Sequence, residues 1–278
     1  MTRELTASFV TLSGAGFAQP ARVPFAERCR AAAAAGFTGI GLHTDDYRHM
    51  LATGASDESL RAVLGTHGLA LREIEFLSGW ATAGTGGGDT VAAVGALGDA
   101  FRPHHVTAGE FTADELDIAG AGARLHTICD EVAAYGLRVA VEAFPWSGLK
   151  DVAKARAVVE ASGAPNAGLM IDVWHFYNTR STLADLDGLP PDRIVAVQLN
   201  DGRVVDGDFL MEARQGRLLP GDGELDVQGL LLGLHERGFR GPYCVEVNYP
   251  GYRDLPVDEM AALAFTKASK VLEVLPAS

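Results

Sequence analysis

Short apolar runs rich in β-forming residues alternate with helical stretches along the whole chain. Eight runs have the length and composition of strands, at residues 5–12, 37–44, 69–77, 104–109, 137–144, 167–172, 193–201 and 243–249. The intervening segments carry helix signals, such as the alanine-rich stretch that ends at Gly36 and the stretch from Ser56 to Gly68. Because parallel strands are joined by crossover helices, this alternation predicts a parallel sheet.

Eight strand–helix units suit a closed (β/α)8 barrel of about 250 residues. We therefore predict an α/β fold, a TIM barrel, with one domain over residues 1–278. The alternative is an open, doubly wound sheet, which would place a glycine-rich phosphate motif after its first strand. "SGAGF" at 13–17 is not G-x-G-x-x-G, and "GTGGGDT" at 84–90 lacks the Gly-Lys-Ser/Thr of a P-loop. We expect the second segment to be a loop.

Composition narrows the range of partners and compartments. The net charge is −13, from 23 basic and 36 acidic residues without a Lys/Arg cluster, so a nucleic-acid partner is not expected. The cysteines Cys29, Cys129 and Cys244 are widely spaced, as reduced structural thiols are. No signal-peptide pattern and no apolar run of about 18 residues are present. The sequence thus predicts a soluble, cytoplasmic protein that does not bind membranes.

Polar side chains close the last four strand-like runs, and a barrel places its chemistry at these carboxyl ends. They are Glu142, Asp172, Gln198 and Glu246, with His175 three residues after Asp172. One such carboxylate alone is often a helix cap or a salt-bridge partner, and His175 alone fits a packed role as well as a catalytic one. Three buried carboxylates with no lysine in these strands need a compensating charge. An all-oxygen set predicts Mn²⁺ or Mg²⁺, with Co²⁺ or Zn²⁺ as alternatives.

These residues resemble a known family, the xylose-isomerase-like TIM-barrel superfamily of sugar phosphate isomerases and epimerases. The resemblance covers nearly the whole chain and rests on Glu142 in "VEAF", Asp172 and His175 in "IDVWH", Gln198 in "VQLND", "RLLPGDGELD" at 217–226 and Glu246 in "VEV". Many members have histidine in place of Gln198. Glutamine there resembles the hydroxypyruvate isomerase and 3-dehydroshikimate dehydratase branches, and Arg217–Glu224 also resembles the former. The endonuclease branch uses extra histidines and a basic surface, which this sequence lacks.

The resemblance and the residues imply one kind of chemistry. A metal ion can chelate the carbonyl and the neighbouring hydroxyl of a polyhydroxy ketone and stabilise the enediolate that forms when the α-proton leaves. Glu142 and Glu246, on strands expected to face each other, are the candidate base and acid, and His175 would orient a ligand or a substrate hydroxyl. Return of the proton gives epimerisation or isomerisation, whereas loss of a β-hydroxyl gives dehydration. The sequence leaves these outcomes open.

Further residues are candidates for binding a small molecule. Arg217 could clamp a substrate oxygen or carboxylate, with Arg214 as the alternative. Trp146 could form a wall, and His43 and Glu75 are expected at the same end of the barrel, where they would bind hydroxyls. The leading hypothesis is a metal-dependent isomerase or epimerase acting on a keto-sugar, cyclitol or related polyhydroxy ketone. A dehydratase or lyase, and a non-catalytic sugar-binding barrel or accessory subunit, are the alternatives; a homo-oligomer is compatible with each.

Overall fold

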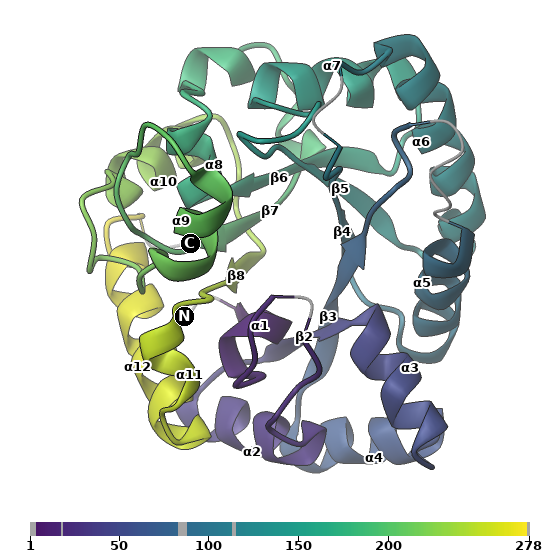
Figure 1. Ribbon diagram of the computed structural model, residues 1–278, viewed down its shortest axis with the longest axis vertical. Helices are drawn as coiled ribbons and strands as arrows, with labels where there is room; N and C mark the ends of the chain where they lie inside the picture. The colour runs from purple at the N-terminus through teal and green to yellow at the C-terminus, as the bar shows by residue number, and fades with distance from the viewer. Residues whose placement is uncertain (1–3, 18, 83–87, 113–114, 277–278) are drawn as a thin grey trace.

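Eight parallel strands close into a barrel in the computed structural model, which describes residues 4–17, 19–82, 88–112 and 115–276 (Figure 1). Each strand pairs with its neighbours in chain order, and β1 pairs with β8 to close the ring. The strands are β1 (Leu5–Ala7), β2 (Gly39–His43), β3 (Ala70–Leu77), β4 (His105–Ala108), β5 (Arg138–Glu142), β6 (Ala167–Asp172), β7 (Ile194–Leu199) and β8 (Tyr243–Val245). The predicted (β/α)8 barrel is therefore confirmed, and the open sheet is excluded.

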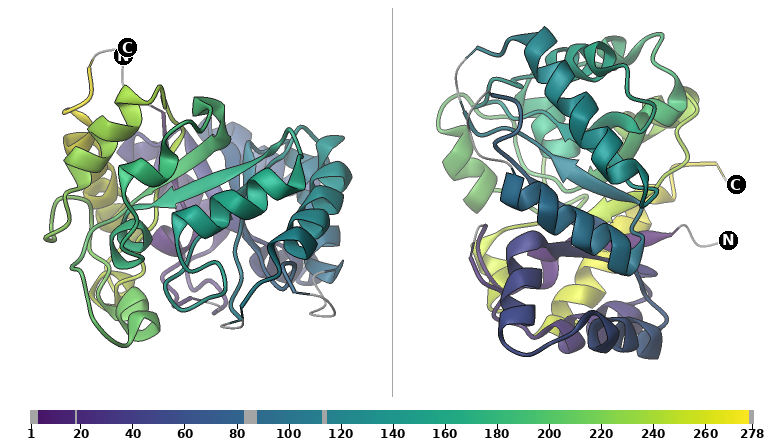
Figure 2. Two further views of the ribbon diagram at one scale, coloured as in Figure 1. Left: turned by 90° about the horizontal axis from the view of Figure 1, so that it is seen from above. Right: turned by 90° about the vertical axis from the view of Figure 1, so that its right-hand side faces the viewer.

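Helices surround the barrel on its outside, as the two side views show (Figure 2). The α-helices are α1 (Phe9–Leu12), α2 (Phe25–Ala35), α3 (Thr44–Ala52), α4 (Asp57–His67), α5 (Gly88–Phe101), α6 (Ile118–Ala133), α7 (Val152–Ser162), α8 (Val173–Asn178), α9 (Phe209–Gln215), α10 (Val227–Glu236), α11 (Pro250–Arg253) and α12 (Val257–Leu272). Two short 3-10 helices are η1 (Leu183–Leu186) and η2 (Pro191–Arg193). Among the residues that the structure describes, no helix combines the length and apolar character needed to cross a membrane.

Local signals set the helix ends. The Ser56 side chain accepts a hydrogen bond from the Ser59 backbone at the start of α4, and Gly68 ends that helix with a φ of 65°. The first predicted strand is shorter than expected, because the chain turns after Ala7 into α1. Of the glycine-rich segment expected to be a loop at 84–90, residues 83–87 lie outside the described residues, and α5 already begins at Gly88.

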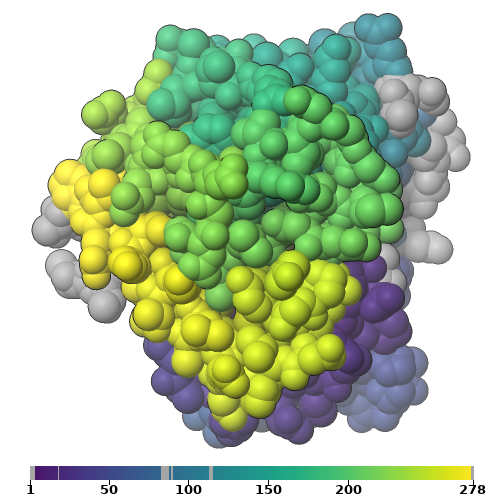
Figure 3. Space-filling model, turned by 60° about the vertical axis from the view of Figure 1, so that its left-hand side comes forward, coloured from purple at the N-terminus to yellow at the C-terminus, as the bar shows by residue number. Residues whose placement is uncertain are grey.

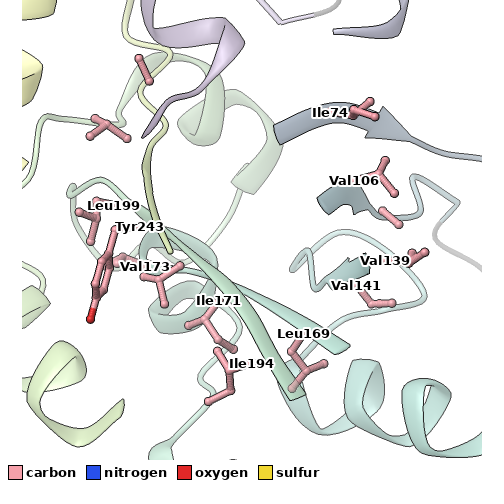
Figure 4. Packing of buried hydrophobic residues seen from close by; sticks show 14 of the residues in the cluster. Ile74, Val106, Val139, Val141, Leu169, Ile171, Val173, Ile194, Leu199 and Tyr243 are labelled. Carbon is pink, nitrogen blue, oxygen red and sulfur yellow. The ribbon is translucent and has the colours of Figure 1, made fainter. Parts of the chain in front are cut away.

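Strand alternation separates the core from the site. In β5 and β6, residues such as Val139, Val141, Leu169 and Ile171 belong to the large hydrophobic cluster, part of which is drawn in Figure 4. Ala140, Met170 and Ala196 instead form a small cluster with Val195. Because side chains two positions apart share a face, Glu142, Asp172 and Gln198 point to the same side as these three residues, which is the barrel interior.

The segments after β7 and β8 lie next to the carboxyl ends of the strands. Figure 3 shows one face of the molecule, on which the green segments that follow β7 lie above the yellow segments of α11 and α12. Leu210, Ala213 and Arg214 of α9 border the same pocket as the strand-end carboxylates. The late part of the chain therefore supplies one wall of the candidate site.

Candidate functional site

The four oxygen-bearing residues at the strand ends meet in one pocket. Glu142 and Asp172 are the last residues of β5 and β6, Gln198 lies in β7, and Glu246 follows β8 directly. Asp172 and Gln198 are opposite each other in the register of β6 and β7. Glu142, Gln198 and Glu246 line the pocket, and Asp172 contacts its Arg217 wall. The structure thus brings together the set that the strand pattern singled out.

Asp172 is held in place by the helix that follows it. Its Oδ1 accepts a hydrogen bond of 2.8 Å from the backbone N–H of His175, which caps the N-terminus of α8. Its Oδ2 accepts one of 2.5 Å from Nδ2 of Asn200. The side chain is fully buried. Asp172 therefore ends a strand and begins a helix with its carboxylate fixed toward the pocket.

A cation does lie among these carboxylates, although no lysine lies in the strands that carry them. Nη1 of Arg217 donates to Oδ2 of Asp172 at 3.1 Å and also to Oε2 of Glu246. Nη2 of Arg217 contacts Nε2 of His175, and the guanidinium lies 5.6 Å from the ring centre of Trp174. Arg217 comes from the loop after α9, 45 positions beyond Asp172, and the strand pattern could not show it.

One guanidinium does not balance the charge. Glu142, Asp172 and Glu246 carry three formal negative charges and Arg217 carries one positive charge, which leaves −3 + 1 = −2. Burial, reinforced by Glu246 and Asp172, raises the pKa of Glu142 well above its ordinary value. Burial also raises the pKa of Glu246 to about 7, although Arg217 opposes the shift. The remaining charge is what a divalent cation would offset.

Gln198 offers a test of whether the residues fit a metal ion. Its Nε2 donates to Oε1 of Glu73 at 3.0 Å, and its Oε1 is buried without a hydrogen-bond partner in the described parts of the chain. A buried carbonyl oxygen without a partner is costly, and a cation would satisfy it. Ligand atoms of Glu142, Asp172 and His175 also lie within 4.8 Å of one another. The donor set therefore fits a divalent ion, which Glu142, Asp172, Gln198 and Glu246 would hold.

His175 is a neutral imidazole at the edge of this cluster. Burial, with Arg217 adding to it, lowers its pKa well below the ordinary value. Its Nε2 lies 3.6 Å from Oε1 of Glu142 and contacts Arg217. Because a guanidinium only donates, Nε2 is the accepting nitrogen and the proton is on Nδ1. His175 can therefore orient Arg217 without carrying a charge of its own.

Aromatic rings form the opposite wall of the pocket. Phe144 stacks on Phe111 with centroids 5.6 Å apart and on Trp146 at 5.1 Å, with interplanar angles of 10° and 7°. His175 meets Phe144 edge-on at 4.8 Å. Phe17 and Phe76 complete the wall. Only Trp146 was anticipated, because the rings come from separate segments and no spacing in the sequence marks them as neighbours.

Of the remaining predicted binding residues, Glu75 and Arg214 lie in this pocket and His43 lies elsewhere. Glu75 lines the pocket and accepts a hydrogen bond from the backbone of Phe9, and burial together with Glu73 raises its pKa well above the ordinary value. Arg214 also lines the pocket. The structure does not bring His43 there: its Nδ1 accepts from the Asp45 backbone at 3.1 Å, capping α3, and its ring packs on Phe9. His43 borders a separate pocket instead.

Two enzymes with known names share part of this sequence. The chain is 30% identical over 128 residues to a 3-dehydroshikimate dehydratase of Pseudomonas putida. The aligned region covers 46% of this chain and 20% of that protein. The chain is 31% identical over 127 residues to an inosose isomerase of Halalkalibacterium halodurans, which covers 45% of this chain and 44% of that one. The match thus spans less than half the length of either relative. One relative is named for the dehydration of 3-dehydroshikimate and the other for the isomerisation of an inosose.

Solved structures share the fold over almost the whole chain. A structure described as IOLI protein with a bound zinc atom has a TM-score of 0.84 at 18% identity, covering 99% of this chain and 100% of that one. A xylose isomerase-like TIM barrel protein from Mycobacterium smegmatis in complex with magnesium has a TM-score of 0.67 at 17% identity, covering 98% of both. The model of one family, described as xylose isomerase-like TIM barrel, matches residues 29–268. The resemblance inferred from the strand-end residues is thereby confirmed, and this chain belongs to the xylose isomerase-like TIM barrel family.

Proposed function

We propose that this protein is a divalent-metal-dependent isomerase or epimerase that moves a proton at the carbon beside a ketone in a polyhydroxy ketone. The observation that carries the proposal is the meeting of two buried carboxylates, Glu142 and Asp172, and the partly buried Glu246 with one guanidinium and an unpartnered Gln198 oxygen. Such a site fits a cation, and a cation can stabilise the enediolate that forms when a carboxylate removes the proton beside a carbonyl. The relatives named inosose isomerase support this class of reaction.

Each residue has a distinct role in this proposal. Glu142, Asp172, Gln198 and Glu246 would hold the metal, which would act as a Lewis acid on the substrate carbonyl. Glu142 and Glu246 come from different strands, β5 and the end of β8, and both line the pocket, so they can exchange a proton with a carbon between them. Arg217 lines the pocket and would bind a substrate oxygen as a forked donor, and His175, which also lines the pocket, would keep Arg217 in place.

The aromatic wall indicates the shape of the substrate. Phe111, Phe144 and Trp146 present stacked apolar surface beside the carboxylates, and Phe111 is 39% exposed. The C–H face of a six-membered ring packs well on such a surface, whereas a long phosphorylated chain gains little from it. We therefore propose a cyclic polyhydroxy ketone, such as an inosose, as the substrate class.

A dehydratase is the second candidate, and Arg214 favours it. Arg214 lines the pocket and is exposed, and its guanidinium has no hydrogen bond or ion pair with any of the residues that the structure describes. A guanidinium in that position suits a substrate carboxylate, which 3-dehydroshikimate carries and an inosose lacks. The relative from Pseudomonas putida is named for that dehydration.

Turnover measured with both substrate types separates these candidates. The protein is loaded with Mn²⁺ for kinetics or Mg²⁺ for NMR and incubated in deuterated water with inososes and with 3-dehydroshikimate. Deuterium incorporated beside the ketone of an inosose supports the isomerase or epimerase, and a dehydrated aromatic product supports the dehydratase. Arg214→Ala should raise KM for the carboxylated substrate and leave KM for the inosose unchanged. Stoichiometric metal with no exchange or turnover of either substrate would contradict the proposal.

A further inference from the structure

Glu73 lies inside the barrel directly beneath the candidate metal site. It comes from β3, and its side chain is fully buried. Its Oε2 accepts a hydrogen bond of 2.5 Å from Ser8, and its Oε1 accepts one of 3.3 Å from Thr107. The same Oε1 accepts one of 3.0 Å from Nε2 of Gln198, 125 positions away in the chain. Glu73 is therefore an acceptor held on both of its oxygens.

The contact with Glu73 decides which end of the Gln198 amide faces the pocket. A side-chain amide has one end that only donates and one that only accepts. The carboxylate of Glu73 accepts, so the NH₂ end of Gln198 must face it and Oε1 must face the other way. That oxygen is buried and has no hydrogen-bond partner in the described residues, while Gln198 lines the pocket. Without Glu73, either end of the amide could face the pocket.

We propose that Glu73 is a positioning residue that turns the carbonyl oxygen of Gln198 toward the metal and thereby sets the affinity of the site. The inference rests on the proposed function, since it requires the metal site, and it adds a buried residue of β3 that contacts Gln198. An NH₂ group facing the site would replace a ligand with a repelling donor. Loss of groups that orient metal ligands commonly costs about 10- to 100-fold in metal affinity.

The surroundings of Glu73 also contain a different set of donors. Ligand atoms of Glu73, His105 and Cys244 lie within 4.8 Å of one another, and all three residues are buried. Nε2 of His105 is 3.4 Å from Oε1 of Glu73. Glu73 already receives hydrogen bonds from Ser8, Thr107 and Gln198, so it is satisfied without a metal of its own. We therefore assign Glu73 to the orientation of Gln198 and not to a second ion.

A double-mutant cycle tests this assignment by calorimetric titration of Mn²⁺, which needs no substrate. Glu73→Met removes the acceptor at similar length and should weaken Mn²⁺ binding about 10- to 100-fold. Gln198→Met should also weaken it, and the double variant should be no weaker than Gln198→Met alone, because Glu73 acts through Gln198. Glu73→Gln keeps an oxygen that can accept from Gln198, so it should bind Mn²⁺ more tightly than Glu73→Met although both variants lose the charge.

Controls separate positioning from general damage. Ser8→Ala disturbs the same carboxylate from its other oxygen and should leave Mn²⁺ binding nearly unchanged while lowering thermal stability. If Glu73→Met does not fold, Glu73→Asp serves instead, because it withdraws the carboxylate from Gln198 but keeps the charge. Glu73→Asp should weaken Mn²⁺ binding in the natural protein and should have no further effect on Mn²⁺ binding in Gln198→Met. Independent, multiplying effects of Glu73 and Gln198 would overturn the inference, as would unchanged binding in Glu73→Met.

The remaining outcomes are equally decisive. A natural protein that binds no divalent ion would remove the proposed function, and this inference with it. Two ions per chain, one of them lost in Cys244→Ala, would show that Glu73 serves a second metal and would overturn its positioning role. One ion per chain, retained in Cys244→Ala, supports the assignment.

Discussion

Nη1 of Arg217 lies 3.1 Å from Oδ2 of Asp172, so a loop residue brings a positive charge to the carboxylate that ends β6. The same guanidinium reaches Glu246. Arg217 therefore partly neutralises two of the groups that we propose as metal ligands, and we propose that it also binds a substrate oxygen. Its effects on metal binding and on turnover should consequently have opposite signs.

Replacing Arg217 by methionine should tighten Mn²⁺ binding while impairing catalysis. Removal of the guanidinium changes the formal charge of the cluster from −2 to −3. Because the positive charge of Arg217 repels a cation a few ångströms away, its removal should raise the affinity for Mn²⁺ about tenfold. The value of kcat/KM should fall about 100-fold or more, because the substrate loses a forked donor. Arg214→Met is the control for metal affinity alone and should leave it unchanged, since Arg214 has no hydrogen bond or ion pair with these carboxylates in the described residues. Weaker metal binding in Arg217→Met would contradict this account.

Asp172→Ala should abolish stoichiometric metal binding in a protein that still folds. The substitution also removes the side-chain cap of α8, which should cost about 1 kcal/mol in the free energy of unfolding. Asp151 provides a matched control, because it caps α7 by accepting from the Lys154 backbone at 2.7 Å. Asp151→Ala should lose about 1 kcal/mol for its own cap and keep the metal. If elemental analysis finds the ion retained in Asp172→Ala, Asp172 is not a ligand.

Glu246→Gln should separate proton transfer from metal binding. Glutamine keeps an oxygen that can ligate but cannot accept the substrate proton, so α-proton exchange should fall about 100-fold or more while metal binding largely survives. Exchange is measured by NMR in deuterated water with a turned-over substrate. Glu224→Gln, at an exposed position of the neighbouring loop, should exchange at the natural rate. Undiminished exchange in Glu246→Gln would leave Glu142 or His175 as the base.

A pair of histidines predicts a loss of stability in mild acid. Nδ1 of His104 lies 3.1 Å from Nδ1 of His105, a distance at which the two rings share one proton. Burial, with His105, Arg138 and Arg72 adding to it, lowers the pKa of His104 to about 4. In the unfolded chain the pKa of His104 has its ordinary value of about 6.5, so as the pH falls the unfolded state takes up a proton before the folded state does. The stabilisation is present above pH 6.5 and is lost as the pH falls from 6.5 toward 4.

Chemical denaturation at pH 7.5 and pH 5.0 measures this loss. The natural protein should lose about 1–2 kcal/mol more of its unfolding free energy between these pH values than His104→Gln does. His49→Gln, which changes an exposed histidine, should show the pH dependence of the natural protein. An identical pH dependence in His104→Gln and the natural protein would show that this histidine does not contribute.

The sequence by itself determined the barrel and the four strand-end residues. Strand-like runs alternating with helical segments depend on local composition, and a strand's pleat decides which side Glu142, Asp172 and Gln198 face. The position of each residue at a strand end then indicates the end of the barrel at which it lies. For this reason the eight strands could be located from the sequence, although β8 is shorter than expected and Glu246 follows it.

Only the tertiary structure decided which residues surround those four. The ion pair of Arg217 with Asp172, the hydrogen bond of Glu73 to Gln198 and the stack of Phe111, Phe144 and Trp146 all join separate segments. Likewise, His43 was placed at the correct end of the barrel but caps α3 and packs on Phe9 instead of reaching the pocket. Such contacts depend on the directions and distances of side chains brought together by barrel closure, and no spacing along the chain encodes them.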